Sequence, residues 1–447
     1  MKKVDAVVIG GSAGGITAAI SCRRRYPEKN VNLIRREEKV LIPCGLPYIF
    51  GTLGSPEKNL IPDAMLANNN IEITKSAVER IDRSNKTVLV ADGSTTSYDK
   101  LILATGSSPI VLPIPGIENE NVFMAQKDVA YLKNMLNVIN SAKDIIIIGG
   151  GFIGVEFADE CKKNHDCNVT IVEVLPHCLQ LALDEEFCVE AEKALTERGI
   201  KLLVNSRVEA ILGDKQVSGI RLSDGKELKA DVVIAAVGYR PNIKLAKEAG
   251  LQIGSSGAIA VDRYMRTTDN NVFACGDCAE KYSFFSGKSS RTMLASIAGA
   301  EGRVAGANLF NIHYRNCGEI GVFSTIIGER SFGCAGLTEA AARQEGCNVV
   351  TAEVTAPDRH PGGMPGATQT KVKLVFSRDD GLLLGGGTSG GRGTGELTNV
   401  ISACIQAKMT AHEVSLFQMG THPALTASPM VYQFVNAAEL AIKSIIV

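Results

Sequence analysis

The sequence lacks an excess of charge of either sign. It has 47 lysines and arginines against 48 aspartates and glutamates, which gives a formal net charge of −1 over 447 residues. A basic surplus is what attracts nucleic acid or an anionic membrane, so we expect neither as a partner. A chain of this length is too long for one compact core and suits two or three domains of about 100–200 residues each.

Long apolar runs are also absent. The best run, 145–155, stops at Glu156, short of the roughly 18 apolar residues that a membrane span needs. The N-terminus imitates a signal peptide, but Asp5 interrupts its start and four glycines lie inside its apolar stretch. We therefore expect a buried strand, a glycine turn and a helix there, with no export signal.

The twelve cysteines lack the even spacing of a disulfide framework. We expect them to be mostly reduced and the protein to be cytoplasmic. Cys275 and Cys278 have the spacing of a metal-ligand pair, but no second pair has credible spacing, so we predict no metal site. Glycine, in contrast, is abundant, with 45 residues.

Many of these glycines belong to a strand–turn–helix pattern that occurs twice. The first copy runs from an apolar stretch at 4–9 into Gly10–Gly15, and the second runs from 144–148 into Gly149–Gly154. Such a turn lets a phosphate approach backbone N–H groups at the positive end of a helix. Two copies predict an α/β fold with two Rossmann-like dinucleotide-binding domains.

The second turn fits the dinucleotide pattern fully. Gly149, Gly151 and Gly154 occupy its three glycine positions, and Glu173 ends the next strand. A carboxylate at that place accepts hydrogen bonds from a ribose 2′-hydroxyl and repels a 2′-phosphate. No lysine or arginine follows closely, so we predict NADH rather than NADPH.

The first turn departs from the pattern. Ser12 replaces the middle glycine, and the next strand ends at Arg35 and Arg36 instead of an acid. Either Glu37 serves from the loop, or an arginine stacks on or bonds the cofactor. Two dinucleotide domains in one chain usually form an electron relay, with a flavin in one domain and a nicotinamide in the other.

The segment Ile42-Pro43-Cys44-Gly45-Leu46-Pro47-Tyr48 resembles the single-cysteine branch of the pyridine nucleotide–disulfide oxidoreductases. That branch holds coenzyme A-disulfide reductases, NADH oxidases, NADH peroxidases and NADH-dependent persulfide or polysulfide reductases. The resemblance covers essentially the whole chain, and the motifs that carry it occur in the family's order: Gly10–Gly15, Cys44, Ala104-Thr105-Gly106, Gly149–Glu156, Val237–Pro241 and Cys275-Gly276-Asp277.

The resemblance implies FAD and NADH as cofactors. It places the FAD pyrophosphate in the first turn, the ribitol chain on Asp277, and Glu156 near the nicotinamide. The residues expected to bind the two cofactors are Gly10, Ser12, Ala13, Gly14, Gly15, Arg35, Arg36, Glu37, Val78, Ala104, Thr105, Gly106, Asp277, Gly149, Gly151, Phe152, Ile153, Gly154, Glu156, Glu173 and Gly238.

Three domains are expected. Residues 1–115 and 250–316 form the FAD-binding domain, 116–249 the NAD-binding domain, and 317–447 an α+β dimerisation domain. The resemblance implies a homodimer in which this last domain contributes to the partner's active site. Within it, the glycine-rich segment Gly385–Gly395 lacks the Gly-Lys-Ser/Thr ending of a phosphate loop, so we interpret it as a strand–helix connection.

Cys44 is the expected redox-active residue. Cysteine attacks as a thiolate, which a helix N-terminus favours, and Pro47 suits a helix start. Position 49 is Ile, so the Cys-x4-Cys pair of glutathione or lipoamide reductases is missing. We expect electrons from NADH to reach Cys44 through FAD, and its thiolate to attack a substrate sulfur and release a thiol or sulfide.

Two further positions bear on the substrate. NADH oxidases and peroxidases of this branch commonly carry a histidine where this chain has Ala13, which favours sulfur reduction here. Coenzyme A-disulfide reductases typically present two tyrosines from the third domain, where this chain has the segments around His360 and His422. Either histidine could donate a proton to the leaving thiolate, and His422 is the catalytic candidate.

We therefore expect a persulfide, polysulfide or coenzyme A-linked sulfur substrate. Arg23 and Arg303 are the candidates to meet the phosphates of coenzyme A. An NADH oxidase that reduces oxygen to peroxide or water is the alternative, since it shares every cofactor motif. A third possibility is an electron carrier that serves a protein partner, which would leave Cys44 without an obvious role.

Overall fold

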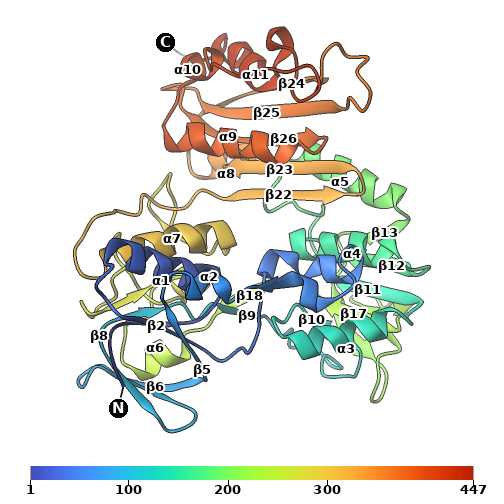
Figure 1. Ribbon diagram of the computed structural model, residues 1–447. Helices are drawn as coiled ribbons and strands as arrows, with labels where there is room; N and C mark the ends of the chain where they lie inside the picture. Colours follow the sequence, from blue (N-terminus) through green and yellow to red (C-terminus); the bar gives the residue numbers. More distant parts are fainter. Residues whose placement is uncertain (1, 446–447) are drawn as a thin grey trace. The chain divides into compact units, whose positions relative to one another are not determined.

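The computed structural model describes residues 2–445 (Figure 1). The chain forms two compact units, each considered by itself. The first comprises 1–112, 124–140 and 237–319, and the second comprises 113–123, 141–236 and 320–447. Within residues 2–445, every helix falls short of the length or the hydrophobicity that a membrane span requires.

The first unit is built on a parallel sheet. Its parallel strands lie in the order β5-β2-β1-β8, with β1 at Lys2–Ile9, β2 at Val31–Arg35, β5 at Glu72–Lys75 and β8 at Thr95–Leu103. On the side of β8 away from β1, β19 (Val272–Ala274) pairs in parallel with the C-terminal end of β8. Residues 6–9 of β1 are apolar and buried, and every residue of β2 is buried, as expected for strands covered on both faces. Strands β6 (Val78–Asp82) and β7 (Thr87–Val90) extend the sheet by antiparallel pairing.

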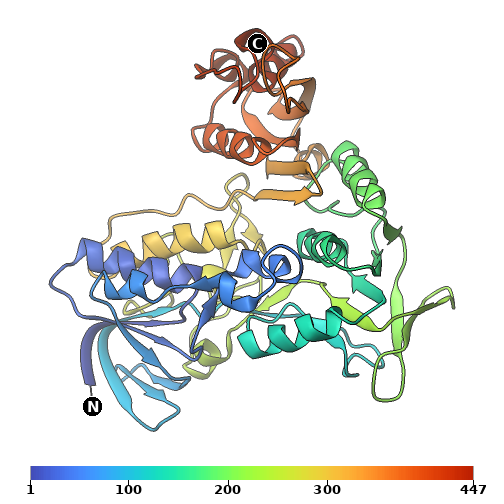
Figure 2. The same ribbon diagram turned by 45° about the vertical axis from the view of Figure 1, so that its right-hand side comes forward.

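Helices α1 (Ala13–Arg25) and α7 (Ala295–Asn308) lie side by side in this unit (Figure 2). Two glycines of α7 permit the close approach. A Cβ atom at Gly302 would lie 2.5 Å from the carbonyl oxygen of Gly14, and one at Gly306 would lie 2.2 Å from that of Ala18. The absence of a side chain at these two positions therefore lets α7 pack closely against the first glycine turn and α1.

Short elements complete the first unit. Its strands pair as β3 (Val40–Leu41) with β4 (Leu60–Ile61), β9 (Ser107–Pro109) with β18 (Tyr239–Pro241), and β20 (Lys281–Tyr282) with β21 (Ser289–Ser290). Its other helices are α2 (Ala64–Ala67), α3 (Val129–Ile139) and α6 (Lys244–Glu248), with 3-10 turns η1 (Pro43–Gly45), η2 (Pro47–Phe50), η3 (Pro56–Asn59) and η4 (Gly276–Cys278).

The second unit contains another Rossmann-like sheet, in the order β10-β17-β11-β12-β13. The strands are β10 (Val122–Met124), β11 (Asp144–Ile148), β12 (Asn168–Val172), β13 (Ile200–Leu203) and β17 (Val232–Ala235), and helices α4 (Phe152–Lys163) and α5 (Glu185–Glu197) follow β11 and β12. A small antiparallel sheet is formed by β14 (Val208–Leu212), β15 (Gly219–Leu222) and β16 (Glu227–Lys229).

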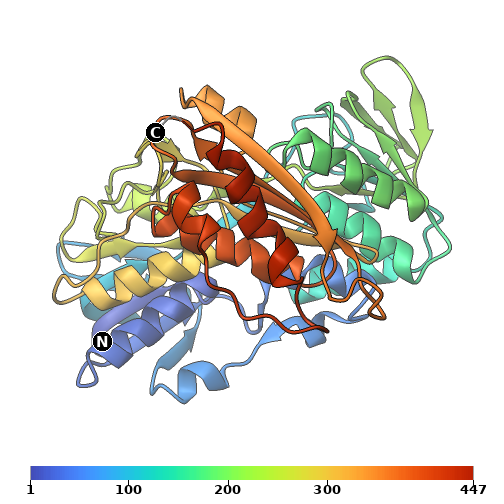
Figure 3. The same cartoon turned by 90° about the horizontal axis from the view of Figure 1, so that it is seen from above.

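The second unit also contains an antiparallel sheet from the C-terminal third of the chain, in the order β22-β23-β26-β25-β24 (Figure 1). Seen from above, its orange strands are partly covered by the red C-terminal helices (Figure 3). Its strands are β22 (Val322–Ile327), β23 (Arg330–Gly336), β24 (Val349–Pro357), β25 (Gln369–Ser377) and β26 (Leu383–Gly390). Its helices are α8 (Glu339–Gln344), α9 (Thr394–Gln406), α10 (Ala411–Ser415) and α11 (Gln433–Ile442), with the 3-10 turn η5 (Pro429–Val431). The predicted fold class is confirmed: two Rossmann-like sheets and a C-terminal α+β region.

One local prediction needs refinement. The glycine-rich segment 385–395 does connect a strand to a helix, but its first six residues belong to β26 itself. The reason is packing, because a Cβ atom at Gly387 would lie 2.5 Å from the ring of Phe187 on α5, and one at Gly386 would lie 2.8 Å from Leu374. These glycines make room for α5 and for a neighbouring strand.

Candidate active site

The first glycine turn is shaped by its own backbone. Gly10 has φ +116°, and a Cβ atom there would lie 2.0 Å from the carbonyl oxygen of Ala104. A Cβ atom at Gly15 would lie 1.9 Å from the carbonyl oxygen of Gly10. Ser12 stands at the N-cap of α1 without a side-chain capping bond, and Ala13 opens the helix. A phosphate is expected at the N–H groups of the first turn of α1.

Arg35 and Arg36, the basic pair after β2, form hydrogen bonds and ion pairs with nearby residues of the first unit. Arg35 is buried, and its guanidinium donates to the carbonyls of Glu37 (3.0 Å) and Glu38 (3.2 Å) and to the Asp63 carboxylate (2.8 Å). Arg36 is exposed and pairs with the Glu37 carboxylate at 2.9 Å. Arg35 thus fixes the loop that follows β2. The side chains of Arg36 and Glu37 lie at the surface of this loop.

Asp277 is held beside the first turn. Ser107 donates a hydrogen bond to its carboxylate at 2.7 Å, and the Lys127 ammonium lies 4.0 Å away. Its neighbour Gly276 lies close to the turn, since a Cβ atom at Gly14 would meet the Gly276 Cα at 3.6 Å. The structure therefore brings three predicted segments together: the turn, 104–107 and 275–277.

Residues 104–106 are hydrogen-bonded to the chain where it returns from the second unit. The Thr105 hydroxyl donates to the Asn242 carbonyl at 2.7 Å, and the Asn242 side chain donates back to the Thr105 carbonyl at 2.9 Å. Gly106 and Gly238 both have positive φ angles, of +67° and +98°. Val78 begins β6 and packs against the hydrophobic core of this unit.

A buried ion pair under Asp277 has no counterpart in the sequence-based expectations. Lys281 and Glu301 have side chains only 3% and 2% exposed, and their charged atoms lie 3.4 Å apart. Glu301 accepts a hydrogen bond from the Gly276 amide at 2.8 Å, and Lys281 donates to the Gly276 carbonyl at 2.7 Å. The pair clamps the backbone just before Asp277. A lysine and a glutamate 20 residues apart give no local signal, so only the fold reveals it.

The second glycine turn repeats the geometry of the first. Gly149 has φ +106°, and a Cβ atom at Gly154 would lie 1.9 Å from the Gly149 carbonyl oxygen. Gly151 is different, because a Cβ atom there would meet nothing within 4 Å. The space beside Gly151, at the start of α4, is therefore open. Ile153, in the first turn of α4, is partly buried.

Glu173 lies next to this turn and is buried. Its two carboxylate oxygens accept hydrogen bonds from the amides of Gly150 (2.5 Å) and Leu175 (2.8 Å). The carboxylate is therefore fixed just after β12, directly beside the turn, by two backbone N–H groups. The prediction of NADH over NADPH depends on a carboxylate at this position.

Glu156 and Phe152 lie on α4 and both contact β22. The Thr325 hydroxyl donates to Glu156 at 3.0 Å, and the rings of Phe152 and Phe323 stack with their centroids 5.1 Å apart. Burial raises the pKa of Glu156 to about 7, while the hydrogen bond from Thr325 lowers it. Sequence reasoning found Glu156 and Phe152 but missed both partners on β22.

Cys44 lies in the first unit, in the 3-10 turn η1, and is exposed. Asn59, which is buried, donates its side-chain amide to the Ile42 carbonyl at 2.9 Å. A Cβ atom at Gly45 would lie 2.0 Å from the Asn59 side-chain oxygen, so the turn fits tightly over Asn59. The helix start predicted at Pro47 is only the four-residue 3-10 turn η2, which is too short to supply an α-helical dipole.

Most other cysteines are buried. Burial raises the pKa of Cys22, Cys178 and Cys188 to about 12, so these thiols stay protonated near neutral pH. Of the twelve cysteines, all within the described residues, Cys44 and Cys317 are the exposed ones. Exposure and motif together single out Cys44.

The two histidine candidates lie in the second unit, whereas Cys44 lies in the first. His422 is exposed, and its Nδ1 accepts a hydrogen bond from the Ala424 amide at 3.2 Å, which leaves the proton of the neutral ring on Nε2. His360 has its Nδ1 3.0 Å from the Thr426 carbonyl, so that nitrogen donates. His422 therefore presents an N–H group on its outer nitrogen.

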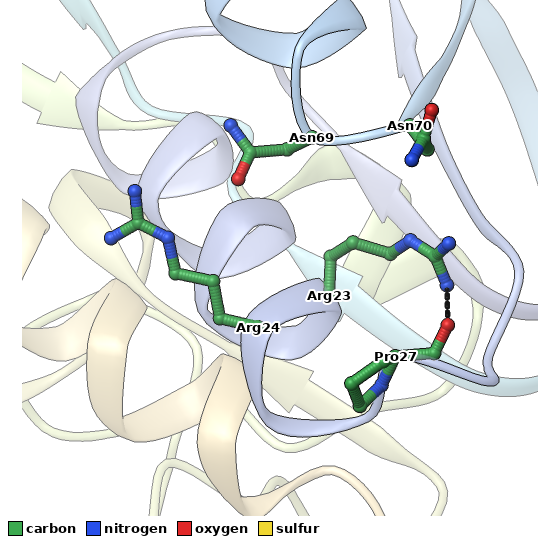
Figure 4. A pocket seen from close by; sticks show the side chains of 5 residues that line it. All are labelled: Arg23, Arg24, Pro27, Asn69 and Asn70. Carbon is green, nitrogen blue, oxygen red and sulfur yellow. Dashed lines mark hydrogen bonds between the residues drawn. The ribbon is translucent and has the colours of Figure 1, made fainter.

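The predicted substrate arginines occupy different elements. Arg23 lies at the end of α1, where its guanidinium donates to the carbonyls of Pro27 and Lys29 and lines a shallow pocket of about 210 Å³ with Arg24, Pro27, Asn69 and Asn70 (Figure 4). Arg303 is exposed on α7. Some of the N–H donors of the Arg23 guanidinium thus already bind backbone carbonyls.

Comparison with known proteins assigns the family. Residues 4–302 match the family described as pyridine nucleotide-disulphide oxidoreductase, and residues 322–431 match its dimerisation domain. The chain belongs to this family. It is 30% identical to an NADH oxidase of Methanocaldococcus jannaschii, over 98% of this chain and 99% of that protein. It is 33% identical to an NAD(P)H coenzyme A polysulfide/persulfide reductase of Pyrococcus horikoshii, over 86% and 87%.

A solved structure gives the same picture. An NAD-dependent persulfide reductase from A. fulgidus superposes with a TM-score of 0.91 at 31% identity, covering 98% of this chain and 83% of that one. The predicted resemblance to this branch is therefore confirmed, and the chain is an enzyme, an NADH-dependent flavoprotein oxidoreductase by family.

Enzymes of this pyridine nucleotide-disulphide oxidoreductase family use FAD and NAD(P)H, which confirms the predicted pair of cofactors at the level of the family. The residues present fit both groups. Each glycine turn has backbone contacts that a side chain would block, and the open space at Gly151 is where a phosphate can approach the N–H groups of α4. We expect the first turn and Asp277 to hold FAD, and the second turn and Glu173 to hold NADH.

Proposed function

We propose that this enzyme uses NADH to reduce the sulfur of a persulfide, polysulfide or disulfide through Cys44. The observation that carries the proposal is Cys44 itself: an exposed thiol on a turn braced by buried Asn59, in a chain whose position 49 is Ile. Because position 49 is Ile, the sulfur that pairs with Cys44 in the proposed cycle comes from the substrate and not from a second cysteine at that spacing.

The chemistry of Cys44 follows from thiol–disulfide exchange. Its thiolate attacks one sulfur of the substrate, the Cys44–sulfur bond forms, and the sulfur–sulfur bond of the substrate breaks. The departing thiolate or sulfide carries the bonding electron pair and takes up a proton, for which His422 Nε2–H is the proposed donor. Two electrons and a proton then return Cys44 to the thiol and release the second sulfur.

The cofactors supply the electrons: FAD, when bound, mediates two-electron transfer between NADH and sulfur. The chain's own task is to hold them. The Gly10–Gly15 turn and Asp277 are the proposed FAD contacts, and the Gly149–Gly154 turn, Glu173 and Glu156 are the proposed NADH contacts. Gly276, Lys281 and Glu301 fix the backbone that carries Asp277.

A coenzyme A-linked substrate is part of this proposal. The relative from Pyrococcus horikoshii is named a coenzyme A polysulfide/persulfide reductase. In this chain the pocket with Arg23 and Arg24 offers positive charge to phosphates (Figure 4). Arg303 is the second proposed contact.

The proposed enzyme is a homodimer. The chain matches the family's dimerisation domain, and three large apolar side chains of that region are strongly exposed: Leu416 (83%), Leu425 (76%) and Met430 (83%). Exposed apolar side chains concentrated in one segment are typical of a surface that another subunit covers.

The deciding experiment replaces Cys44 by Ser. We expect Cys44→Ser to lose at least about 1,000-fold of its turnover with polysulfide, coenzyme A persulfide and coenzyme A disulfide, because the attacking thiolate is gone. Anaerobic reduction of the bound flavin by NADH should proceed at the rate of the unaltered enzyme. Cys317→Ser, which removes the other exposed thiol, is the matched control and should change neither rate.

Reduction of oxygen is the second candidate function. It is favoured by the relative from Methanocaldococcus jannaschii, which is named an NADH oxidase and aligns over 98% of this chain. The ratio of kcat/KM for oxygen to that for each sulfur substrate separates the two functions. Full sulfur reduction by Cys44→Ser, or a ratio that strongly favours oxygen, would overturn the proposal.

A further inference from the structure

Strand β22 comes from the C-terminal sheet, yet it supplies side chains to the helix that follows the second glycine turn. Phe323 and Thr325 are two residues apart, so they lie on the same face of the strand, while Ser324 between them is exposed on the other face. That face packs against α4 within the second unit.

Two specific contacts join these elements. The rings of Phe323 and Phe152 stack with an interplanar angle of 3° and centroids 5.1 Å apart. Two residues further along β22, and one helical turn further along α4, the buried Thr325 hydroxyl donates to the Glu156 carboxylate at 3.0 Å. Glu156 is therefore fixed from outside the Rossmann-like sheet.

We propose that β22 forms part of the nicotinamide site, with Thr325 as a positioning residue that orients the Glu156 carboxylate and favours its ionised form. Phe323 braces Phe152, the first residue of α4. The inference rests on the proposed place of Glu156 near the nicotinamide, and it does not depend on which substrate Cys44 reduces.

The charges around Glu156 are few. Burial raises its pKa to about 7, the Thr325 hydroxyl lowers it, and the charge of Glu160, one turn along α4, raises it. Glu160 is itself paired with Lys163. Of the strands packed against α4, β12 and β22 contain no ionisable side chain, β11 contributes Asp144 at its start, and β13 contributes the exposed Lys201.

This arrangement gives Thr325 a measurable effect. A nicotinamide ring gains positive charge when it gives up a hydride, so an ionised carboxylate near it favours that transfer. The Thr325 hydroxyl stabilises the ionised carboxylate more than the protonated one, and we expect this difference to amount to about 0.4–1 pKa unit. Removing the Thr325 hydroxyl should therefore raise the pH at which Glu156 ionises by about that amount.

The experiment compares Thr325→Val, Thr325→Ser and the control Ser324→Ala in the full-length holoenzyme. The rate of flavin reduction by NADH is measured anaerobically, without sulfur substrate, from about pH 5.5 to 9. We expect the rate to rise through a midpoint near pH 7, and Thr325→Val to move this midpoint upward by about 0.4–1 unit. Thr325→Ser should restore the midpoint, and Ser324→Ala should leave it in place.

A binding measurement provides the second readout. Because NAD⁺ carries the positive nicotinamide, its binding should favour ionised Glu156 and release a proton near pH 7, which calorimetry in two buffers of different ionisation enthalpy detects. The pH of maximal proton release should shift upward in Thr325→Val by the same amount as the kinetic midpoint.

Two outcomes would overturn the inference, and they are distinguishable. If Glu156→Gln leaves the pH dependence intact, Glu156 does not act near the nicotinamide and its proposed role fails. If Glu156→Gln abolishes the pH dependence but Thr325→Val does not move it, β22 is only a packing partner and the role of Thr325 fails. A normal melting temperature for Thr325→Val, which is nearly isosteric, confirms that the folded enzyme is being compared.

Discussion

At the scale of single residues, the two acids of the proposed NADH site differ in what surrounds them. Glu173 accepts two backbone N–H groups, whereas Glu156 accepts one hydroxyl and is otherwise desolvated. Burial without full compensation raises the pKa of Glu156 to about 7. Glu156 is thus suited to a charge that titrates in the working range of the enzyme, whereas the Glu173 carboxylate is held in place by two backbone amides.

The charge on Glu173 leads to a prediction about cofactor choice. In Glu173→Gln the negative charge that repels a 2′-phosphate is absent, so the ratio of kcat/KM for NADH to that for NADPH should fall about tenfold. Steady-state kinetics with both cofactors checks this. Glu197→Gln, a neutralised exposed acid on α5, should leave the ratio unchanged, and an unchanged ratio in Glu173→Gln would remove Glu173 from the discrimination.

Sequence reasoning reached some of these residues and missed others for a physical reason. Glu173 and Gly151 stand at fixed distances along one strand–turn–helix unit, so a pattern finds them. Lys281, Glu301 and Thr325 make contacts with residues far from them in the chain. The distance between two residues along the sequence does not predict such contacts. A buried ion pair is visible in sequence only as two ordinary charged residues.

At the scale of elements, the close packing of α1 against α7 depends on glycine. Gly302 faces the Gly14 carbonyl, whereas Gly299, one turn earlier, has its nearest atoms at 3.8 Å or beyond. The two positions share one helix and one residue type, and they differ in the space available. They therefore form a matched pair for a test.

We expect Gly302→Ala to lower the free energy of unfolding by about 1–3 kcal/mol and to weaken retention of FAD, because α7 must move away from the first glycine turn. Gly299→Ala should be neutral or stabilising by up to about 1 kcal/mol, since alanine is the better helix former. Urea unfolding and the flavin-to-protein ratio of the purified variants measure both effects. Equal stability of the two variants would show that α7 shifts at little cost.

Glycine also separates what a pattern indicates from what packing requires. Gly10 and Gly149 have positive φ angles in turns, and the sequence pattern identified both turns. Gly386 and Gly387 lie inside β26, where no turn requires them, and they are explained by Leu374 and by the Phe187 ring. A glycine-rich segment therefore predicted a connection correctly and its strand boundary incorrectly.

At the scale of the whole molecule, the exposed apolar side chains of 416–431 lead to a prediction about assembly. If a second copy covers them, Leu425→Lys combined with Met430→Lys should shift the protein from dimer toward monomer, about halving the mass seen by light scattering at micromolar concentration. Leu181→Lys, which alters an equally exposed leucine (90%) elsewhere in the second unit, is the control. A dimer that survives the double substitution would place the interface on another surface.

The sequence by itself determined the α/β class, the two glycine turns, the family and its cofactors, and it predicted Cys44 as the redox-active residue. These follow from short, local patterns in which backbone geometry leaves few alternatives. The division into domains at 115, 249 and 316 stays a prediction, as do the individual site residues. Only the tertiary structure decided that Cys44 is exposed on a braced turn, that Arg35 is committed to a loop, and that β22 reaches Glu156. Such contacts depend on which elements pack together, and packing is a property of the whole chain rather than of any segment.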